Sequence, residues 1–253
     1  VLLPLLYALS IAFMPSSEVF TTDLNLIPKN PTISNFVDVL KKVPLFKFVF
    51  NSFVVAGLIT LGQIVSCSLA AFSFSFLNFK GKEILFMLVM STMMIPGEAT
   101  IISNYLTVSS WNWLDSYQVL IVPYLTSAMG IFLFRQFFKG LPRDLDEAAV
   151  IDGCNKVQIF TKILAPLAKP AFITVGVLSS VFWWNEMFQP LIYINTESLK
   201  PLTIGVLSAF KVQFVNQWHL QMAFSVIMMI PPIILFTFAQ KYLVDGIKTS
   251  GLK

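Results

Sequence analysis

The chain is a series of long apolar intervals separated by shorter polar ones. Charged residues are absent from residues 48–79, 116–134 and 212–240. Because about 20 mainly apolar helical residues cross the core of a bilayer, each interval predicts a transmembrane helix. Two further apolar intervals, which contain one carboxylate each, and the apolar beginning of the chain also predict spans. The six predicted spans cover approximately residues 1–17, 48–76, 84–103, 116–138, 170–194 and 219–241.

Composition excludes the other broad classes of protein. Hydrophobic residues make up 56% of the 253 residues and charged residues only 12%, whereas a soluble chain is about 25% charged. The 11 Gly and 2 Cys residues do not fit a collagen-like chain or a disulfide scaffold. We therefore predict an all-α integral membrane protein in which residues 1–253 form a single transmembrane domain. The first apolar segment, which has no basic leader, fits a span better than a signal peptide.

Basic residues are divided unequally between the two sides of the predicted bundle. Eleven of the 17 Lys and Arg residues fall on one side and six on the other. The side that is richer in basic residues is expected to be cytoplasmic. Both termini then lie in the cytoplasm, and residues 18–47 form an external loop. The formal net charge of +4 follows from this bias and does not call for a nucleic-acid partner.

The polar stretch between the fourth and fifth spans has the pattern of two short helices. Its first turn contains three carboxylates, Asp144, Asp146 and Glu147, where the helix dipole favours negative charge. Gly153 is expected to end this helix, and Asn155 to cap a second helix that continues until Pro166. The first helix should carry a face of small or short side chains formed by Leu145, Ala148, Ala149 and Asp152.

This stretch resembles the EAA loop of binding-protein-dependent ABC importer permeases. The matching pattern is E-A-A, three residues, G, nine residues and I-x-L-P, with Ala165 in place of the expected Leu; the matching residues are Glu147, Ala148, Ala149, Gly153, Ile163 and Pro166. Residues 134–138 and 241–247, together with Trp184-Asn185, are similar to the MalG-like permeases of sugar uptake systems. We refer to residues 142–166 as the EAA loop.

The resemblance implies a type I ABC importer permease fold with a coupling helix that docks on a cytoplasmic ATPase. In this picture Glu147 makes a polar contact, Ala148 and Ala149 permit close packing, and Gly153, after Asp152, supplies the turn. The implied partners are a MalF-like second permease, an ABC ATPase dimer, an extracytoplasmic binding protein and membrane lipid. This chain lacks G-x-x-x-x-G-K-[ST]. ATP and Mg are therefore expected on the separate ATPase, and this chain is expected to be non-catalytic and to bind no cofactor or metal.

An alternative for the EAA loop is an amphipathic pair of helices lying on the inner leaflet. Such surface helices favour basic polar faces. The first turn of this loop contains three carboxylates instead. The resemblance and the acidic turn therefore favour docking on an ATPase over binding to lipid.

Polar groups near the outer ends of two spans suggest where a solute passes. Asn185, Glu186 and Gln189 are hypothesised to line an outward vestibule for a polyhydroxylated ligand, with Trp184 and the neighbouring Trp183 stacking on sugar rings. The alternative is that Glu186, like Glu98, only reaches interfacial water, because a carboxylate deep in the membrane is costly.

The sequence thus predicts a multi-pass permease in the cell membrane that imports a sugar or oligosaccharide. Another solute, such as glycerol phosphate or a polyamine, remains an alternative, although no buried Arg or Lys is expected in the spans to meet an anion. A membrane-embedded enzyme is a more distant alternative, because a catalytic constellation is missing. His219 is expected at the interface, and Cys67 and Cys154 are too far apart in the predicted topology to form a disulfide.

Overall fold

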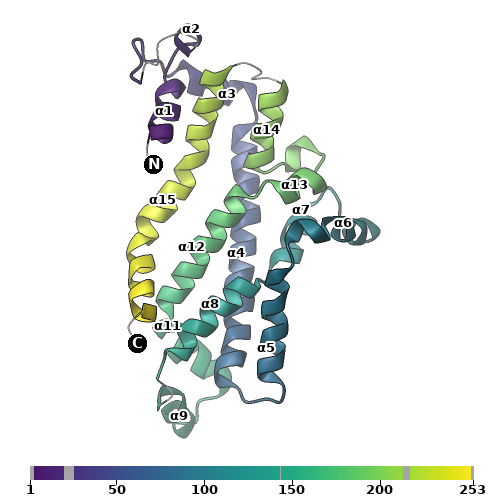
Figure 1. The fold of residues 1–253 in the computed structure, drawn as a ribbon, viewed down its shortest axis with the longest axis vertical. Helices are drawn as coiled ribbons and strands as arrows, with labels where there is room; N and C mark the ends of the chain where they lie inside the picture. The colour runs from purple at the N-terminus through teal and green to yellow at the C-terminus, as the bar shows by residue number, and fades with distance from the viewer. Residues whose placement is uncertain (1–2, 20–25, 143, 213–216, 252–253) are drawn as a thin grey trace. The chain divides into compact units, whose positions relative to one another are not determined.

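The computed structural model describes residues 3–19, 26–142, 144–212 and 217–251 (Figure 1). Its helices, in chain order, are α1 (Leu3–Ala12), α2 (Ser16–Val19), α3 (Ser34–Lys42), α4 (Leu45–Phe76), α5 (Lys82–Ser91), η1 (Thr92–Met94), η2 (Gly97–Thr100), α6 (Ile101–Ser110), α7 (Tyr117–Ile121), η3 (Val122–Tyr124), α8 (Ala128–Lys139), α9 (Asp144–Ile151), α10 (Lys156–Gln158), η4 (Ile159–Leu164), α11 (Ala165–Leu167), α12 (Lys169–Asn185), α13 (Phe188–Tyr193), η5 (Glu197–Leu199), α14 (Leu202–Val212) and α15 (Trp218–Gly251).

The described residues contain helices and no strand, which confirms the predicted all-helical class. Residues 1 and 2 of the first predicted span, residues 20–25 of the predicted external loop and Arg143 of the EAA loop lie outside the described residues.

Three helical segments are long and apolar enough to cross a membrane, and the number rises to five if each of two bent helix pairs forms one span. The three segments, Leu45–Phe76, Tyr117–Lys139 and Trp218–Gln240, overlap the spans predicted at 48–76, 116–138 and 219–241. Within the first predicted span, α1 covers ten residues, about half the length that crosses a bilayer core. The total of six spans stays a prediction.

The predicted span 84–103 is not a single straight helix. Residues 82–94 and 97–110 meet at an angle of 89°, and Figure 1 shows α6 turned away from α5. Ile95 and Pro96 both have extended backbone conformations at the bend. A proline disfavours the helical conformation of the residue before it, so Pro96 accounts for this break.

The predicted span 170–194 is also interrupted, because α12 ends at Asn185 and the short helix α13 follows. A carboxylate oxygen of Glu186 accepts a hydrogen bond from the backbone N–H of Gln189 at 3.0 Å. This bond satisfies one of the N–H groups that have no partner within the first turn of α13. Pro190, in the same turn, has no N–H to satisfy.

The chain packs as two units, each with its own core. Unit 1 comprises residues 1–54 and 184–235, and unit 2 comprises residues 55–183 and 236–253, so that α4, α12 and α15 contribute to both. In unit 1, Phe48 of α4 packs with Leu202 of α14 and Phe224 of α15. A Cβ added at Gly205 would lie 2.3 Å from the Phe48 ring, so α14 approaches α4 closely where it lacks a side chain.

Two polar side chains of α4 hold the beginning of α14 in unit 1. The amide nitrogen of the fully buried Asn51 donates to the carbonyls of Ser198 and Lys200 at 3.0 and 2.9 Å. The Ser52 hydroxyl accepts from the backbone N–H of Leu202 at 2.8 Å. The Ser52 bond satisfies an N–H at the start of α14, and the Asn51 bonds satisfy carbonyls at the end of η5.

The core of unit 2 joins the ends of several helices to the EAA loop. Phe76 of α4 packs against Phe138 of α8, with ring centroids 6.2 Å apart. Phe72 of α4 packs against Phe160 of η4 at 5.4 Å. Ala149 of α9 is buried in the same cluster. The EAA loop is therefore packed onto the helices of unit 2 and is not a free connection.

The segment from α7 to α8 is broken between Tyr124 and Ala128, and α4 supplies the missing hydrogen-bond partners. Gln63 donates to the Tyr124 carbonyl at 2.9 Å, and Ser66 donates to the carbonyl of the next residue at 2.6 Å. The Ser127 N–H donates to the Cys67 sulfur at 3.3 Å. In a membrane, backbone groups freed by a helix break require such partners within the protein.

Candidate functional site

The EAA loop begins with the acidic first turn that the sequence predicts. Asp144, Asp146 and Glu147 all lie in the first turn of α9, which Figure 1 places at the lower end of the picture. Asp146 forms an ion pair with Lys156 of α10, with Nζ and a carboxylate oxygen 3.7 Å apart. Glu147 is exposed. The Asp146 carboxylate thus joins the two short helices of the loop, and the Glu147 side chain is on the surface.

Gly153 ends α9 in a Schellman motif. Its φ angle is +79°, in the left-handed region. The N–H of Cys154 donates to the carbonyl of Ala149 at 2.9 Å, and the N–H of Gly153 donates to the carbonyl of Val150 at 3.1 Å. This pair of bonds with a left-handed residue between them defines the motif. A Cβ added at Gly153 would meet no atom within 4 Å, so the backbone conformation, and not space, requires glycine. The predicted end of the helix is confirmed.

Asn155 caps the second short helix, as predicted. Its side-chain oxygen accepts from the N–H of Gln158 at 2.9 Å, and the Gln158 side chain accepts from the N–H of Asn155 at 2.8 Å. This reciprocal pair is a capping box. The spacing N-x-x-Q, which the prediction did not use, is the signal for it. The helix then widens into one π-helical segment, Ile159–Leu164, before Pro166.

The structure divides the five predicted coupling residues between a surface and a core. Glu147, Ala148, Asp152 and Gly153 are exposed. Ala149 is buried in the core of unit 2. Ala149, which was predicted together with Ala148 to permit close packing, places its small side chain against this chain's own helices.

Exposed apolar side chains accompany these residues, and of them only Leu145 was singled out from the sequence. Ile151 is 86% exposed and Val157 70% exposed, and Leu145 and Val150 are also exposed. Leu145, Ala148, Ile151 and Asp152 are spaced three or four residues apart and so share one face of α9. The sequence signal that could have revealed this face is the spacing of its apolar residues, at three to four positions, within a short helix of a polar loop. The loop presents an apolar surface beside the Glu147 carboxylate.

An ion pair between the buried Arg135 and the exposed Glu83 lies where α8 leads into the loop. Arg135 is only 4% exposed, and one guanidinium nitrogen donates to both carboxylate oxygens of Glu83 at 2.8 Å. The guanidinium also lies over the Phe86 ring, 3.8 Å from its centroid. The expectation of no buried cation in the spans is therefore wrong. Arg135 is neutralised within the chain by Glu83, which the sequence places 52 residues away.

Trp184 of the hypothesised vestibule is a core residue of unit 1. It is 6% exposed, and its indole N–H donates to the carbonyl of Met228 at 3.2 Å. Its ring meets Phe53 edge to face, with centroids 4.9 Å apart. The indole ring and its N–H thus both have partners within unit 1. In unit 2, Trp183 packs against Tyr124, with centroids 4.6 Å apart.

The other three vestibule residues have different environments. Asn185 is exposed. The Glu186 carboxylate accepts from an N–H in the first turn of α13, and its backbone carbonyl accepts from the Thr203 hydroxyl at 2.8 Å. The side-chain oxygen of Gln189 is buried and has no hydrogen-bond partner among the described residues. Within the same described ranges, His, Cys, Asp and Glu do not gather into a group that suits a metal ion, and Cys67 and Cys154 are free thiols.

The described residues thus form an all-helical, largely apolar chain whose polar loop has an acidic first turn and a capping box. Residues 63–249 match the family described as binding-protein-dependent transport system inner membrane component. The chain belongs to this family of ABC importer permeases. It is therefore a non-catalytic, multi-pass inner-membrane permease subunit, and membership implies an ATPase and a binding protein as partners.

Similar proteins cover nearly the whole chain. The arabinooligosaccharides transport system permease protein AraQ of Bacillus subtilis is 34% identical over 255 residues, which is 100% of this chain and 90% of that protein. The sn-glycerol-3-phosphate transport system permease protein UgpE of Escherichia coli is 31% identical over 257 residues, covering 99% of this chain and 92% of that protein.

A solved structure has the same fold. It is the crystal structure of a bacterial ABC transporter involved in the import of the acidic polysaccharide alginate, and the similarity has a TM-score of 0.85. The match covers 95% of this chain and 90% of that chain at 23% sequence identity. The observed helices therefore form an ABC importer permease fold.

Proposed function

We propose that this chain forms half of the pore of an ATP-driven importer and that its EAA loop docks on the ATPase subunit. The observation that carries the proposal is the surface of α9, where Ile151 and its apolar neighbours are exposed beside the Glu147 carboxylate. Apolar side chains exposed together on a small helix are typical of an interaction site. The Schellman motif and the capping box preform this surface, which lowers the entropic cost of docking.

The residues of the EAA loop have different roles in the proposed docking. Glu147 provides a polar contact for the ATPase, and Ala148 permits close approach on the same face of α9. Asp152 and Gly153 complete the surface, and Gly153 also holds the turn. Ala149 acts from inside, because its burial in the core of unit 2 connects α9 to the helices. ATP and Mg are used by the ATPase, and this chain binds no cofactor of its own.

Charge reversal at Glu147 tests the docking proposal. The chain is co-expressed with the ATPase and the second permease of its transport system and purified through a tag on this chain. We expect the Glu147→Lys variant to reach the membrane but to lose the ATPase, because the surface of α9 loses its carboxylate and gains a cation.

Glu98→Lys is the matched control, since Glu98 is an exposed carboxylate outside the loop. It should retain the ATPase. Recovery of the ATPase with Glu147→Lys in the same yield as with the parent chain would contradict the proposal.

We infer that the imported solute is a sugar or oligosaccharide delivered by an extracytoplasmic binding protein. Support comes from the full-length similarity to the permease named for arabinooligosaccharides. Glycerol phosphate is the second candidate, because a permease named for sn-glycerol-3-phosphate is nearly as similar; a polyamine is a further alternative. The one buried cation described in α8, Arg135, is paired with Glu83 and is not offered to an anionic solute.

Uptake into proteoliposomes separates these candidates. Labelled arabinotriose, sn-glycerol 3-phosphate and putrescine are supplied in turn with the binding protein. Transport of arabinotriose alone is the expected result, and transport of either other probe instead would contradict a sugar. Asn185, Glu186 and Gln189 are proposed to contact the solute, and Asn185→Ala should then raise the apparent KM.

The assembly that we propose places this chain beside a MalF-like second permease in lipid, with an ABC ATPase dimer below both. The excess of basic residues supports an orientation with both termini and the EAA loop in the cytoplasm. Residues 18–47 then face the binding protein.

A further inference from the structure

Glu83 and Arg135 form a directional link between α5 and α8. Glu83 lies in the first turn of α5 and is 65% exposed, whereas the Arg135 side chain is 5% exposed. One guanidinium nitrogen lies 2.8 Å from both carboxylate oxygens, and charge-assisted hydrogen bonds of this kind are about twice as strong as neutral ones. Ring-to-ring contacts, such as Phe76 with Phe138, have no comparable directionality.

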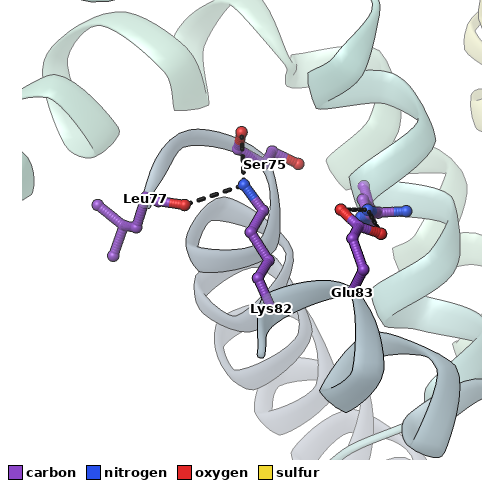
Figure 2. Close-up of polar contacts among 5 residues, drawn as sticks. Ser75, Leu77, Lys82 and Glu83 are labelled. Carbon is purple, nitrogen blue, oxygen red and sulfur yellow. Dashed lines mark hydrogen bonds and ion pairs between the residues drawn. The ribbon is translucent and has the colours of Figure 1, made fainter. Parts of the chain in front are cut away.

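The residue before Glu83 ties α5 to α4. Lys82 Nζ donates to the carbonyls of Leu77 and Ser75 at 2.9 and 3.5 Å, just beyond and within the last turn of α4. Figure 2 shows Lys82 turned back toward these carbonyls, while the neighbouring Glu83 carboxylate has a different partner. A lysine in this position satisfies carbonyls that have no partner within the helix. Consecutive residues of α5 thus bind the end of α4 and the side of α8.

Arg135 is also close to the EAA loop along the chain. It lies in the last turns of α8, which ends at Lys139, and α9 begins at Asp144. Buried Phe138, one turn after Arg135, shares a core with Ala149 of α9. Packed side chains thus connect α9 with α8, and the ion pair connects α8 with α5.

We propose that Glu83 and Arg135 are positioning residues for transport, which make α5 move together with α8 when the ATPase displaces the EAA loop. The inference rests on the proposed docking of the loop. Loss of the pair leaves the two helices in apolar contact but free to slip.

The distance between α5 and α8 in two nucleotide states tests this inference. Spin labels are placed at the exposed positions Leu88→Cys of α5 and Met129→Cys of α8, with Cys154 replaced by Ser and the buried Cys67 left in place. The complex with the ATPase is measured by EPR without nucleotide and after trapping with ATP, Mg and vanadate. In the parent chain we expect the same distance in both states.

In Glu83→Gln we expect the distances of the two states to differ by more than the width of the parent distribution. Glu98→Gln is the matched control and should behave as the parent chain does. If Glu83→Gln does not assemble, Arg135→Lys, which keeps the cation but not the planar guanidinium, should show the same shift.

Three results would overturn the inference: equal distances in both states of the pair variants, unequal distances in the parent chain, or the same shift in Glu98→Gln. Failure of the docking proposal looks different, because the ATPase is then recovered with Glu147→Lys in the same yield as with the parent chain. In that case the inference falls with the docking proposal before any distance is measured.

Discussion

Substitution of Gly153 by alanine isolates the conformational requirement of the EAA loop. Gly153 has a φ of +79°, and the added Cβ would meet no atom within 4 Å. The left-handed conformation costs a residue with a Cβ about 1–2 kcal/mol. No clash between the added Cβ and neighbouring residues increases this cost. This cost lowers, by the same amount, the free energy needed to open the loop, that is, to break the two hydrogen bonds of the Schellman motif. The population of the open loop should rise by a factor of about 5–30.

Amide hydrogen exchange of the purified chain in nanodiscs measures this change. The peptide that contains the N–H groups of Gly153 and Cys154 reports directly on the two bonds of the Schellman motif. We expect faster exchange in Gly153→Ala by about the same factor, because exchange follows the open population when reclosing is fast. Gly153→Asn is the control, since asparagine tolerates the left-handed region better. Equal exchange in the alanine and asparagine variants, or no change in alanine, would refute the reasoning.

Two further predictions concern packing. Ala149→Leu should lower the apparent melting temperature, because extra carbons in a filled core cost about 1–3 kcal/mol. Leucine at the exposed Ala148 should leave the melting temperature nearly unchanged. Equal melting temperatures of the two variants would contradict the assignment of Ala149 to the core. Gly205→Ala should destabilise the chain by a similar amount, because its Cβ would lie 2.3 Å from the Phe48 ring. Alanine at Gly57, where a Cβ meets nothing within 4 Å, should be neutral or stabilising. Thermal denaturation followed by circular dichroism checks both pairs, and a stable Gly205→Ala variant would refute the second prediction.

Features that depend on a few neighbouring residues were predictable from the sequence. The acidic first turn of α9, its end at Gly153 and the cap at Asn155 all follow from local backbone chemistry, and the structure contains each of them. The long apolar helices are predictable for the same reason, because hydropathy is a property of one segment. The 89° bend was not predicted, since a proline within an apolar run does not by itself say how far the chain turns.

Features that depend on distant partners were not predictable. Arg135 has the sequence pattern of a loop charge, and only its contact with Glu83 explains its burial. Trp184 lies in α12, which is apolar on all sides, so periodicity could not tell which side packs. Ala148 and Ala149 are the same residue type in neighbouring positions, so the sequence could not show that only Ala149 is buried in the core of unit 2.

The break between α7 and α8 has an evolutionary consequence. Three groups of α4, on Gln63, Ser66 and Cys67, each complete one backbone group at the break. If residues 124–127 formed a continuous helix, these polar groups of α4 would have no hydrogen-bond partners. If α4 carried apolar residues at the same positions, the backbone groups at the break would have no partners in the membrane. The two segments can therefore change only together, and their sequences should covary among relatives of this permease although about 60 positions separate them.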